Sequence, residues 1–151
     1  MPEFAWDNMI AEGPNAIVHD GTIYLIYSGS LVGIDYTTGL VTAPAGQDAD
    51  LTDPNVWTKL DYPLQKSGVY NGQWQLGTGH GMWSNDEDGN LIYVFHNAEY
   101  ENGRYGGRDA QVRRVHWSKE GMPILDMQAA EELNPDYADI TMKIVVSGNK
   151  G

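Results

Sequence analysis

Two titratable side chains occupy matching positions in two successive repeats of the sequence. Glu12 stands shortly before one apolar segment, and His80 stands between two glycines before another. When the pair Asp20-Gly21 is set on Asp88-Gly89, Glu12 aligns with His80 without a gap. A carboxyl group at the mouth of a strand is held by a rigid scaffold and points outward. We therefore expect a repeat architecture that brings the two side chains together at a shared centre.

Short strands joined by tight turns are the elements that must position these residues. Each Asp-Gly pair is typical of a two-residue hairpin turn, and an apolar strand follows each pair, at 22–27 and 90–95. Apart from one candidate helical turn at 127–133, helix-period segments are absent. The sequence therefore predicts an all-β fold, with further short strands at 31–36, 109–117 and 140–146 and a brief strand or turn at 55–59.

A repeat of four short strands is typical of a β-propeller blade. We expect about two four-stranded antiparallel blades, at residues 6–72 and 73–125, followed by a C-terminal extension at 126–151 that carries the last strand. Known propellers use roughly four to eight blades, so two cannot close a ring. The chain is therefore predicted to be a partial propeller, completed either by missing N-terminal blades or by self-association into a homo-oligomer.

Charge and composition exclude several classes of partner. A net charge of −12 argues against nucleic acid and anionic membranes, and no apolar run approaches the roughly 20 residues that span a bilayer. The first residues lack the basic and apolar regions of a signal peptide, which favours the cytoplasm slightly and leaves secretion open. Five Trp and nine Tyr offer flat faces that suit neutral sugars, although their default role is core packing.

Several familiar site motifs fail on inspection. The chain has no cysteine, and its other histidines show neither helical pairing nor Cys partners, so a zinc site is not predicted. The acidic segment 86–89 resembles a calcium loop, but Phe95 stands where that loop needs a bidentate Glu. The glycines at 77, 79 and 81 lack the strand-to-helix context of a dinucleotide-binding loop.

Three stretches, in this order and spacing, resemble family 43 glycoside hydrolases, which are five-bladed propeller enzymes acting on arabinans and xylans. Glu12-Gly13-Pro14 with its following strand is similar to the strand that carries the general acid of that family. Gly79-His80-Gly81 is similar to the final blade, whose histidine lies near the central axis. The segment from Gly107 to Pro123 is similar to the arginine-bearing strand and closing turn. The resemblance runs from about Trp6 to Leu125.

The resemblance implies that Glu12 is the catalytic general acid of an inverting hydrolase acting on a pentose-containing oligosaccharide. That reaction needs a protonated carboxyl and, roughly 6.5–9.5 Å away, an ionised carboxylate that activates water. Partial desolvation at a strand mouth would raise the pKa of Glu12. The other two carboxylates of the family lie in earlier blades, so we expect the isolated chain to be inactive. The alternative is a non-catalytic carbohydrate-binding or scaffold half-propeller that assembles by oligomerisation, with Glu12 an ordinary exposed turn residue.

The resemblance also implies substrate-binding roles for four further residues. His80 would contact sugar or hold a cation through water, so a Ca²⁺ ion at the propeller axis is allowed although no cofactor is required. Arg108 would present its donors to a sugar hydroxyl or a catalytic carboxylate. Trp74 and Trp83 flank His80 and would line a sugar subsite. Each has a structural alternative: a loop-bonding histidine, a surface arginine, and two tryptophans of the core.

Overall fold

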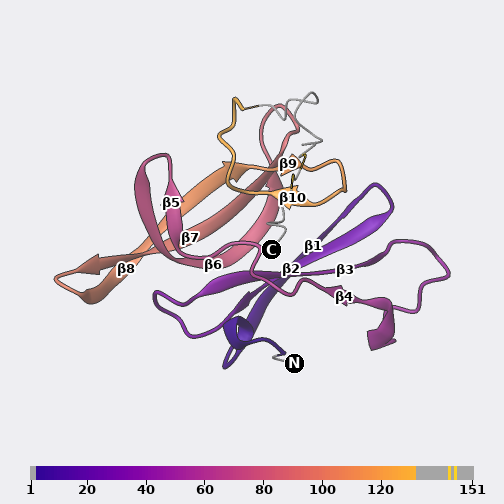
Figure 1. Ribbon diagram of the computed structural model, residues 1–151, viewed down its shortest axis with the longest axis horizontal. Coiled ribbons are helices and arrows are strands. Elements are labelled where there is room, and N and C mark those ends of the chain that lie inside the picture. The colour runs from indigo at the N-terminus through magenta and orange to yellow at the C-terminus, as the bar shows by residue number, and fades with distance from the viewer. Residues whose placement is uncertain (1–2, 132–142, 144, 146–151) are drawn as a thin grey trace, which may run out of the picture.

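The computed structural model describes residues 3–131, 143 and 145, which form two four-stranded antiparallel sheets and a small ribbon (Figure 1). The first sheet contains β1 (Ala11–His19), β2 (Thr22–Gly29), β3 (Thr37–Pro44) and β4 (Thr58–Lys59), in that order. The second contains β5 (Gly68–Tyr70), β6 (Gln73–Asn85), β7 (Leu91–Glu101) and β8 (Arg104–Arg114). The ribbon pairs β9 (His116–Trp117) with β10 (Pro123–Ile124). The predicted all-β class with two four-stranded antiparallel sheets is confirmed.

Two short 3₁₀ turns, η1 (Ala5–Asp7) and η2 (Pro54–Val56), are the helical elements within residues 3–131. Among the residues that the structure describes, no helix has the length and apolar character needed to cross a bilayer. The blade limits at 72/73 and 125/126 stay predictions; β5, which lies just before residue 73, pairs with β6 of the second sheet.

The two Asp-Gly turns differ from one another. Asp20 and Gly21 have φ angles of 45° and 75° and directly join the pair His19–Thr22, which is the predicted two-residue turn. The turn predicted at Asp88-Gly89 is wrong, because the connection is longer and spans residues 86–90. There the Asp86 carboxylate accepts the backbone N–H groups of Asp88 at 3.0 Å and Asn90 at 2.7 Å. A side chain that bonds the backbone two residues ahead favours this wider loop.

Other predicted elements are also corrected. Residues 31–36 form bends and turns instead of a strand, with a φ of 139° at Gly33, a value that favours glycine. The segment 55–59, predicted as a brief strand or turn, contains both: most of η2, which Asp53 caps, and the two residues of β4. Residues 127–131 contain a turn closed from the N–H of Glu131 to the carbonyl of Gln128, and no helix. Residues 132–133 and, apart from 143 and 145, the strand predicted at 140–146 lie outside the described residues.

The hydrophobic core lies between the two sheets. Aromatic side chains dominate it, and Tyr93 is completely buried. The core consists of Tyr24, Ile26 and Leu40 from the first sheet, Trp83, Tyr93 and Phe95 from the second, and Val115 and Leu125. Burial of these apolar surfaces stabilises the packing of one sheet on the other.

The opposite face of each sheet carries a row of apolar side chains. Val94 on β7 alternates with the core residues, so it points away from the core and pairs with Met82 on one side and Val112 on the other. Met82 is 50% exposed and Val112 is 58% exposed. By the same alternation Leu25 lies between Ala16 and Val41 on the outer face of the first sheet. Through these two rows, both outer faces present apolar surface that can pack against additional protein.

Candidate active site

Hydrogen bonds join strand β6 to the first sheet beside the site. The N–H of Trp83 donates to Oδ1 of Asn15 at 2.8 Å, and the N–H of His80 donates to Oγ of Ser28 at 2.7 Å. The side chains of Asn15 and Ser28 therefore hold β6 in place against β1 and β2. This arrangement sets the positions of the two predicted site residues.

Glu12 lies at the start of β1, where the pairing with β2 is irregular. Its Cα pairs with that of Ser28, and the register shifts between Glu12 and Asn15. Gly13 within this bulge has a φ of 62°. A bulge bends its strand and re-aims a side chain, and here the side chain of Glu12 is 43% exposed.

His80 lies in a matching irregularity of β6, within the register shift between Gly79 and Met82. Its own φ is 50°, an uncommon value for a residue other than glycine. The neighbouring glycines are required by packing, because a Cβ at Gly79 would overlap the ring of Tyr36 and one at Gly81 would overlap that of Tyr93. The imidazole packs over Gly13, and its Nδ1 lies 3.8 Å from Oε1 of Glu12.

Tyr36 lies between these two side chains and was missed from the sequence. Its hydroxyl donates to Oε1 of Glu12 at 2.6 Å and lies 3.2 Å from Nδ1 of His80. The residue is completely buried. Burial, together with the bond to Glu12, raises the pKa of Tyr36 to about 12. The sequence did contain a signal for Tyr36, because this residue directly precedes β3. In an antiparallel sheet of order β1-β2-β3, the starts of β1 and β3 lie at the same end, so Tyr36 must lie near the start of β1.

Arg108 approaches the site from β8 but does not bond Glu12. Its side chain is exposed, and its Nε donates to the hydroxyl of Tyr105 at 2.6 Å. Burial, together with the charges of Arg108 and His80, lowers the pKa of His96 to about 4. His96, which stacks on Tyr36 at 5.6 Å, is therefore neutral near neutral pH.

The two tryptophans proposed for a sugar subsite have different surroundings. Trp83 is only 7% exposed, packs on Tyr93 and donates its Nε1–H to the carbonyl of Tyr24 at 3.3 Å. Trp83 therefore packs in the core, which was the alternative to its predicted role in a sugar subsite. Trp74 is 71% exposed beside Val69. It keeps a free aromatic surface.

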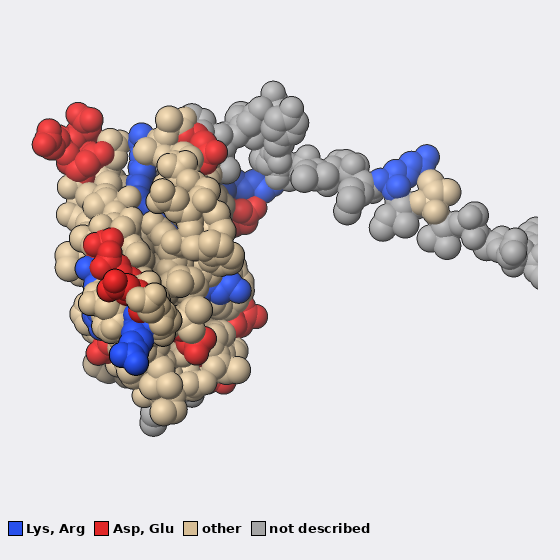
Figure 2. Space-filling model, turned by 90° about the vertical axis from the view of Figure 1, so that its left-hand side faces the viewer, with Lys and Arg blue, Asp and Glu red and all other residues tan. Residues whose placement is uncertain are grey.

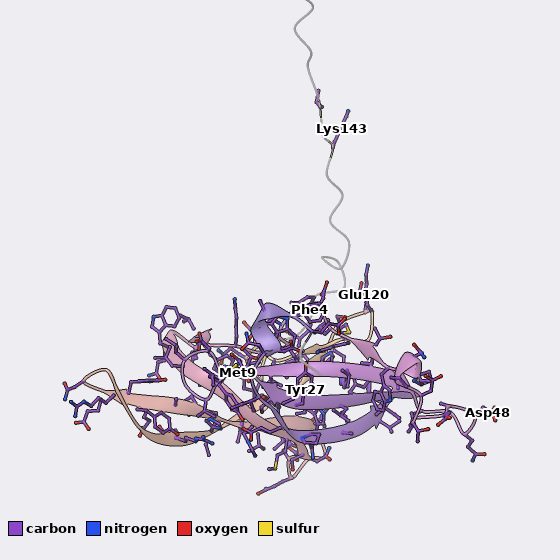
Figure 3. The ribbon with its side chains drawn as sticks, turned by 90° about the horizontal axis from the view of Figure 1, so that it is seen from below. Phe4, Met9, Tyr27, Asp48, Glu120 and Lys143 are labelled. Atoms are coloured by element: carbon purple, nitrogen blue, oxygen red, sulfur yellow. The ribbon has the colours of Figure 1, made fainter. Side chains whose placement is uncertain are left out.

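A second carboxylate, Asp7, lines the same cavity as Glu12. The cavity measures about 510 Å³ and also touches Tyr27, Trp57 and Lys59. Asp7 is 1% exposed, and two of the residues that bond its carboxylate, Phe4 and Tyr27, are labelled in Figure 3. Burial alone would raise the pKa of Asp7, but the bonds from Lys59 and from two backbone N–H groups outweigh it and lower this pKa.

Every oxygen of Asp7 is occupied. Oδ1 accepts the N–H groups of Glu3 and Phe4, and Oδ2 accepts the Tyr27 hydroxyl and forms an ion pair with Lys59. A carboxylate with both oxygens bound to protein donors anchors η1 and has no lone pair directed at a water. Asp7 therefore does not supply a general base.

The described residues do not form a calcium site around His80. No group of three or more His, Cys, Asp or Glu side chains among them is arranged to hold a metal ion. Ca²⁺ takes six to eight oxygen ligands, whereas Nδ1 of His80 faces a tyrosine hydroxyl.

On the face shown in Figure 2, acidic and basic side chains are interspersed, without a continuous basic surface for a polyanion.

Two packed four-stranded antiparallel sheets, with a carboxyl and an imidazole brought together from adjoining strands, are the arrangement expected of neighbouring propeller blades. The sequence profile of glycosyl hydrolases family 43 matches residues 3–123, and the chain belongs to this family. It is similar to the crystal structure of an alpha-L-arabinofuranosidase from Lactobacillus brevis, with a TM-score of 0.71 and 30% identity over 81% of this chain. The predicted partial propeller is thereby confirmed.

Two curated relatives point to the same family. An extracellular exo-alpha-(1->5)-L-arabinofuranosidase of Streptomyces avermitilis is 30% identical over 89% of this chain, and alpha-L-arabinofuranosidase 43 of Humicola insolens is 34% identical over 81%. The chain spans only 29% and 26% of these two proteins, and 39% of the Lactobacillus brevis chain. It corresponds to a part of such an enzyme.

Proposed function

We propose that this chain forms the general-acid side of an inverting family 43 glycosidase that acts on arabinose- or xylose-containing polysaccharides, with Glu12 as the proton donor. The observation that carries the proposal is the position of Glu12: a half-exposed carboxyl in a strand bulge, 3.8 Å from His80. The family membership gives this carboxyl a substrate class, and the arabinofuranosidase relatives favour a terminal arabinofuranose.

In this proposal the exposed side of Glu12 faces the glycosidic oxygen and gives it a proton as the bond breaks. His80 binds a sugar hydroxyl, and Arg108 moves from Tyr105 to the substrate or to a carboxylate of the missing blades. Trp74 offers an aromatic surface for a more distant sugar. The base that activates water comes from blades that precede this segment, since Asp7 is bound to Lys59.

The test is complementation. The N-terminal blades of the Lactobacillus brevis arabinofuranosidase, ending before the segment similar to this chain, are mixed with the chain and assayed on arabinofuranosides and xylosides. We expect negligible hydrolysis by either part alone and hydrolysis by the mixture that Glu12→Gln removes. Robust turnover by the isolated chain that survives Glu12→Gln would overturn the proposal.

The second candidate is a non-catalytic carbohydrate-binding half-propeller that assembles with copies of itself. The exposed row Met82, Val94 and Val112 favours it, because such a row can pack on a second copy. Calorimetry with arabino- and xylo-oligosaccharides separates the two candidates. Binding that Glu12→Gln leaves unchanged, with no turnover after complementation, supports the binding module.

A further inference from the structure

We propose that Tyr36 is a positioning residue whose buried hydroxyl lets Glu12 and His80 share a single proton. The inference deepens the proposed function, on which it rests for its catalytic meaning. It is carried by the geometry of three side chains: Glu12 on β1, His80 on β6, and Tyr36 directly before β3. The hydroxyl lies 2.6 Å from Oε1 of Glu12 and 3.2 Å from Nδ1 of His80, while the two end groups are 3.8 Å apart.

A tyrosine hydroxyl has one proton to donate and can accept others. It can therefore donate to only one of its two neighbours at a time. When Glu12 is ionised, the hydroxyl donates a hydrogen bond to Oε1 and accepts one from Nδ1–H of His80. When Glu12 is protonated, its own O–H donates to the Tyr36 oxygen, and the hydroxyl turns to donate to Nδ1.

These two arrangements contain the same number of protons if His80 is an imidazolium in the first and neutral in the second. The change between them moves the Nδ1 proton of His80 to the Tyr36 oxygen as the Tyr36 proton moves to Oε1 of Glu12. Tyr36 itself remains neutral throughout. His80 thus serves as the proton reservoir for Glu12, and no bulk water is needed between them.

The surroundings fix Tyr36 in this role. The side chain is completely buried, its ring lies against Gly79 without room for a Cβ, and His96 stacks on it. Burial raises the pKa of Tyr36 to about 12, so the hydroxyl keeps its proton at neutral pH. The other groups that influence the site are the Ser28 hydroxyl, the Arg108 charge and the neutral imidazole of His96.

The catalytic consequence concerns the first half of each cycle. Before the glycosidic bond breaks, the shared proton moves from His80 through Tyr36 to Oε1, and a half-turn of the carboxyl about its Cγ–Cδ bond carries it to the substrate side. Glu12 then gives this proton to the leaving sugar, which leaves Glu12 ionised and His80 neutral. The pair regains one proton from solvent at His80, whose side chain is 49% exposed, before the next cycle.

The test is ¹⁵N NMR of His80 in the 151-residue chain at a pH where Glu12 is ionised and His80 is neutral. The wild type is expected to hold the Nδ1–H tautomer, because Nδ1 must donate to Tyr36. Tyr36→Phe is expected to shift His80 to the Nε2–H tautomer that free histidine prefers. Tyr27→Phe is the matched control, because it removes the hydroxyl that bonds Asp7, and it should leave the tautomer of His80 unchanged.

An Nε2–H tautomer in the wild type would overturn the proposal, even if the Phe variant failed to fold. The same tautomer in the wild type and in a folded Tyr36→Phe variant would also overturn it. Neither result depends on hydrolysis. Failure of the proton sharing is therefore distinguishable from failure of Glu12 as the acid, which the complementation assay tests.

Discussion

Glu12 and His80 lie 3.8 Å apart, which is the proximity that the register of the repeat predicted. A repeat places equivalent positions on equivalent corners, so this contact could be inferred without coordinates. Tyr36 could not be found in the same way, because residues 31–36 have the apolar composition of a strand but turn at Gly33 instead. The turn at Gly33 places the Tyr36 hydroxyl against the carboxyl of Glu12. A prediction of a strand at 31–36 does not reveal this contact.

A pH prediction at the residue scale concerns His96. Its pKa in the folded chain is lowered from 6.5 to about 4, mainly by burial, so the folded state binds this proton less well than the unfolded state. The stability that His96 contributes is present above pH 6.5 and is lost as the pH falls toward 4. We expect His96→Gln to lose less thermal stability than the wild type between pH 7 and pH 4.5.

Thermal unfolding at both pH values, followed by circular dichroism, measures this difference. His19→Gln is the matched control, since His19 lies at the far end of β1 and stacks on Trp117. Equal losses for the wild type and the His96→Gln variant would show that the burial of His96 does not disfavour its protonated form.

At the scale of the elements, the close packing of β6 depends on its glycines. A Cβ at Gly81 would overlap the ring of Tyr93, which is fully buried and bonded to Thr38 at 2.7 Å. Gly81→Ala is therefore expected to lower the free energy of unfolding by about 1–3 kcal/mol. Gly46→Ala, at a glycine with nothing within 4 Å of its Cβ position, should stay near the wild type.

Urea denaturation of the two variants is the measurement. A Gly81→Ala variant as stable as Gly46→Ala would mean that β6 and Tyr93 can move apart without loss, contrary to the packing described here.

The strands were largely predictable and the connections were not. Asp20-Gly21 forms its predicted turn because both residues adopt positive φ, whereas the carboxylate of Asp86 organises a longer loop around Asp88-Gly89. An Asp-Gly pair carries the same local signal in both places. The side-chain bond that decides between a two-residue turn and a wider loop comes from outside the pair.

For the whole molecule, the two outward rows of apolar residues are the dominant feature. Blades of a propeller pack face to face, so these rows are where neighbouring blades, or further copies of the chain, would bind. We predict that the chain sediments as a homo-oligomer and that Val112→Lys, which places a charge at the β8 end of the exposed row, shifts it toward the monomer. Tyr62→Lys, at an equally exposed residue of a loop, should leave the assembled mass unchanged.

Sedimentation equilibrium of the wild type and both variants measures the association. A monomeric wild type with cooperative unfolding would contradict the prediction and would mean that the outer rows tolerate water. Neither the composition nor the repeat could decide this point, because an exposed apolar face has the same sequence pattern as a buried one.

The leaving-group dependence of Glu12→Gln in the complemented enzyme tests the central claim most directly. A general acid contributes about 10²–10⁴-fold when the departing oxygen needs a proton and little when it does not. We predict that Glu12→Gln lowers kcat/KM by this factor for an alkyl arabinofuranoside and leaves hydrolysis of a dinitrophenyl arabinofuranoside nearly unchanged. Equal losses on both substrates, or no loss on either, would contradict the assignment of Glu12 as the proton donor.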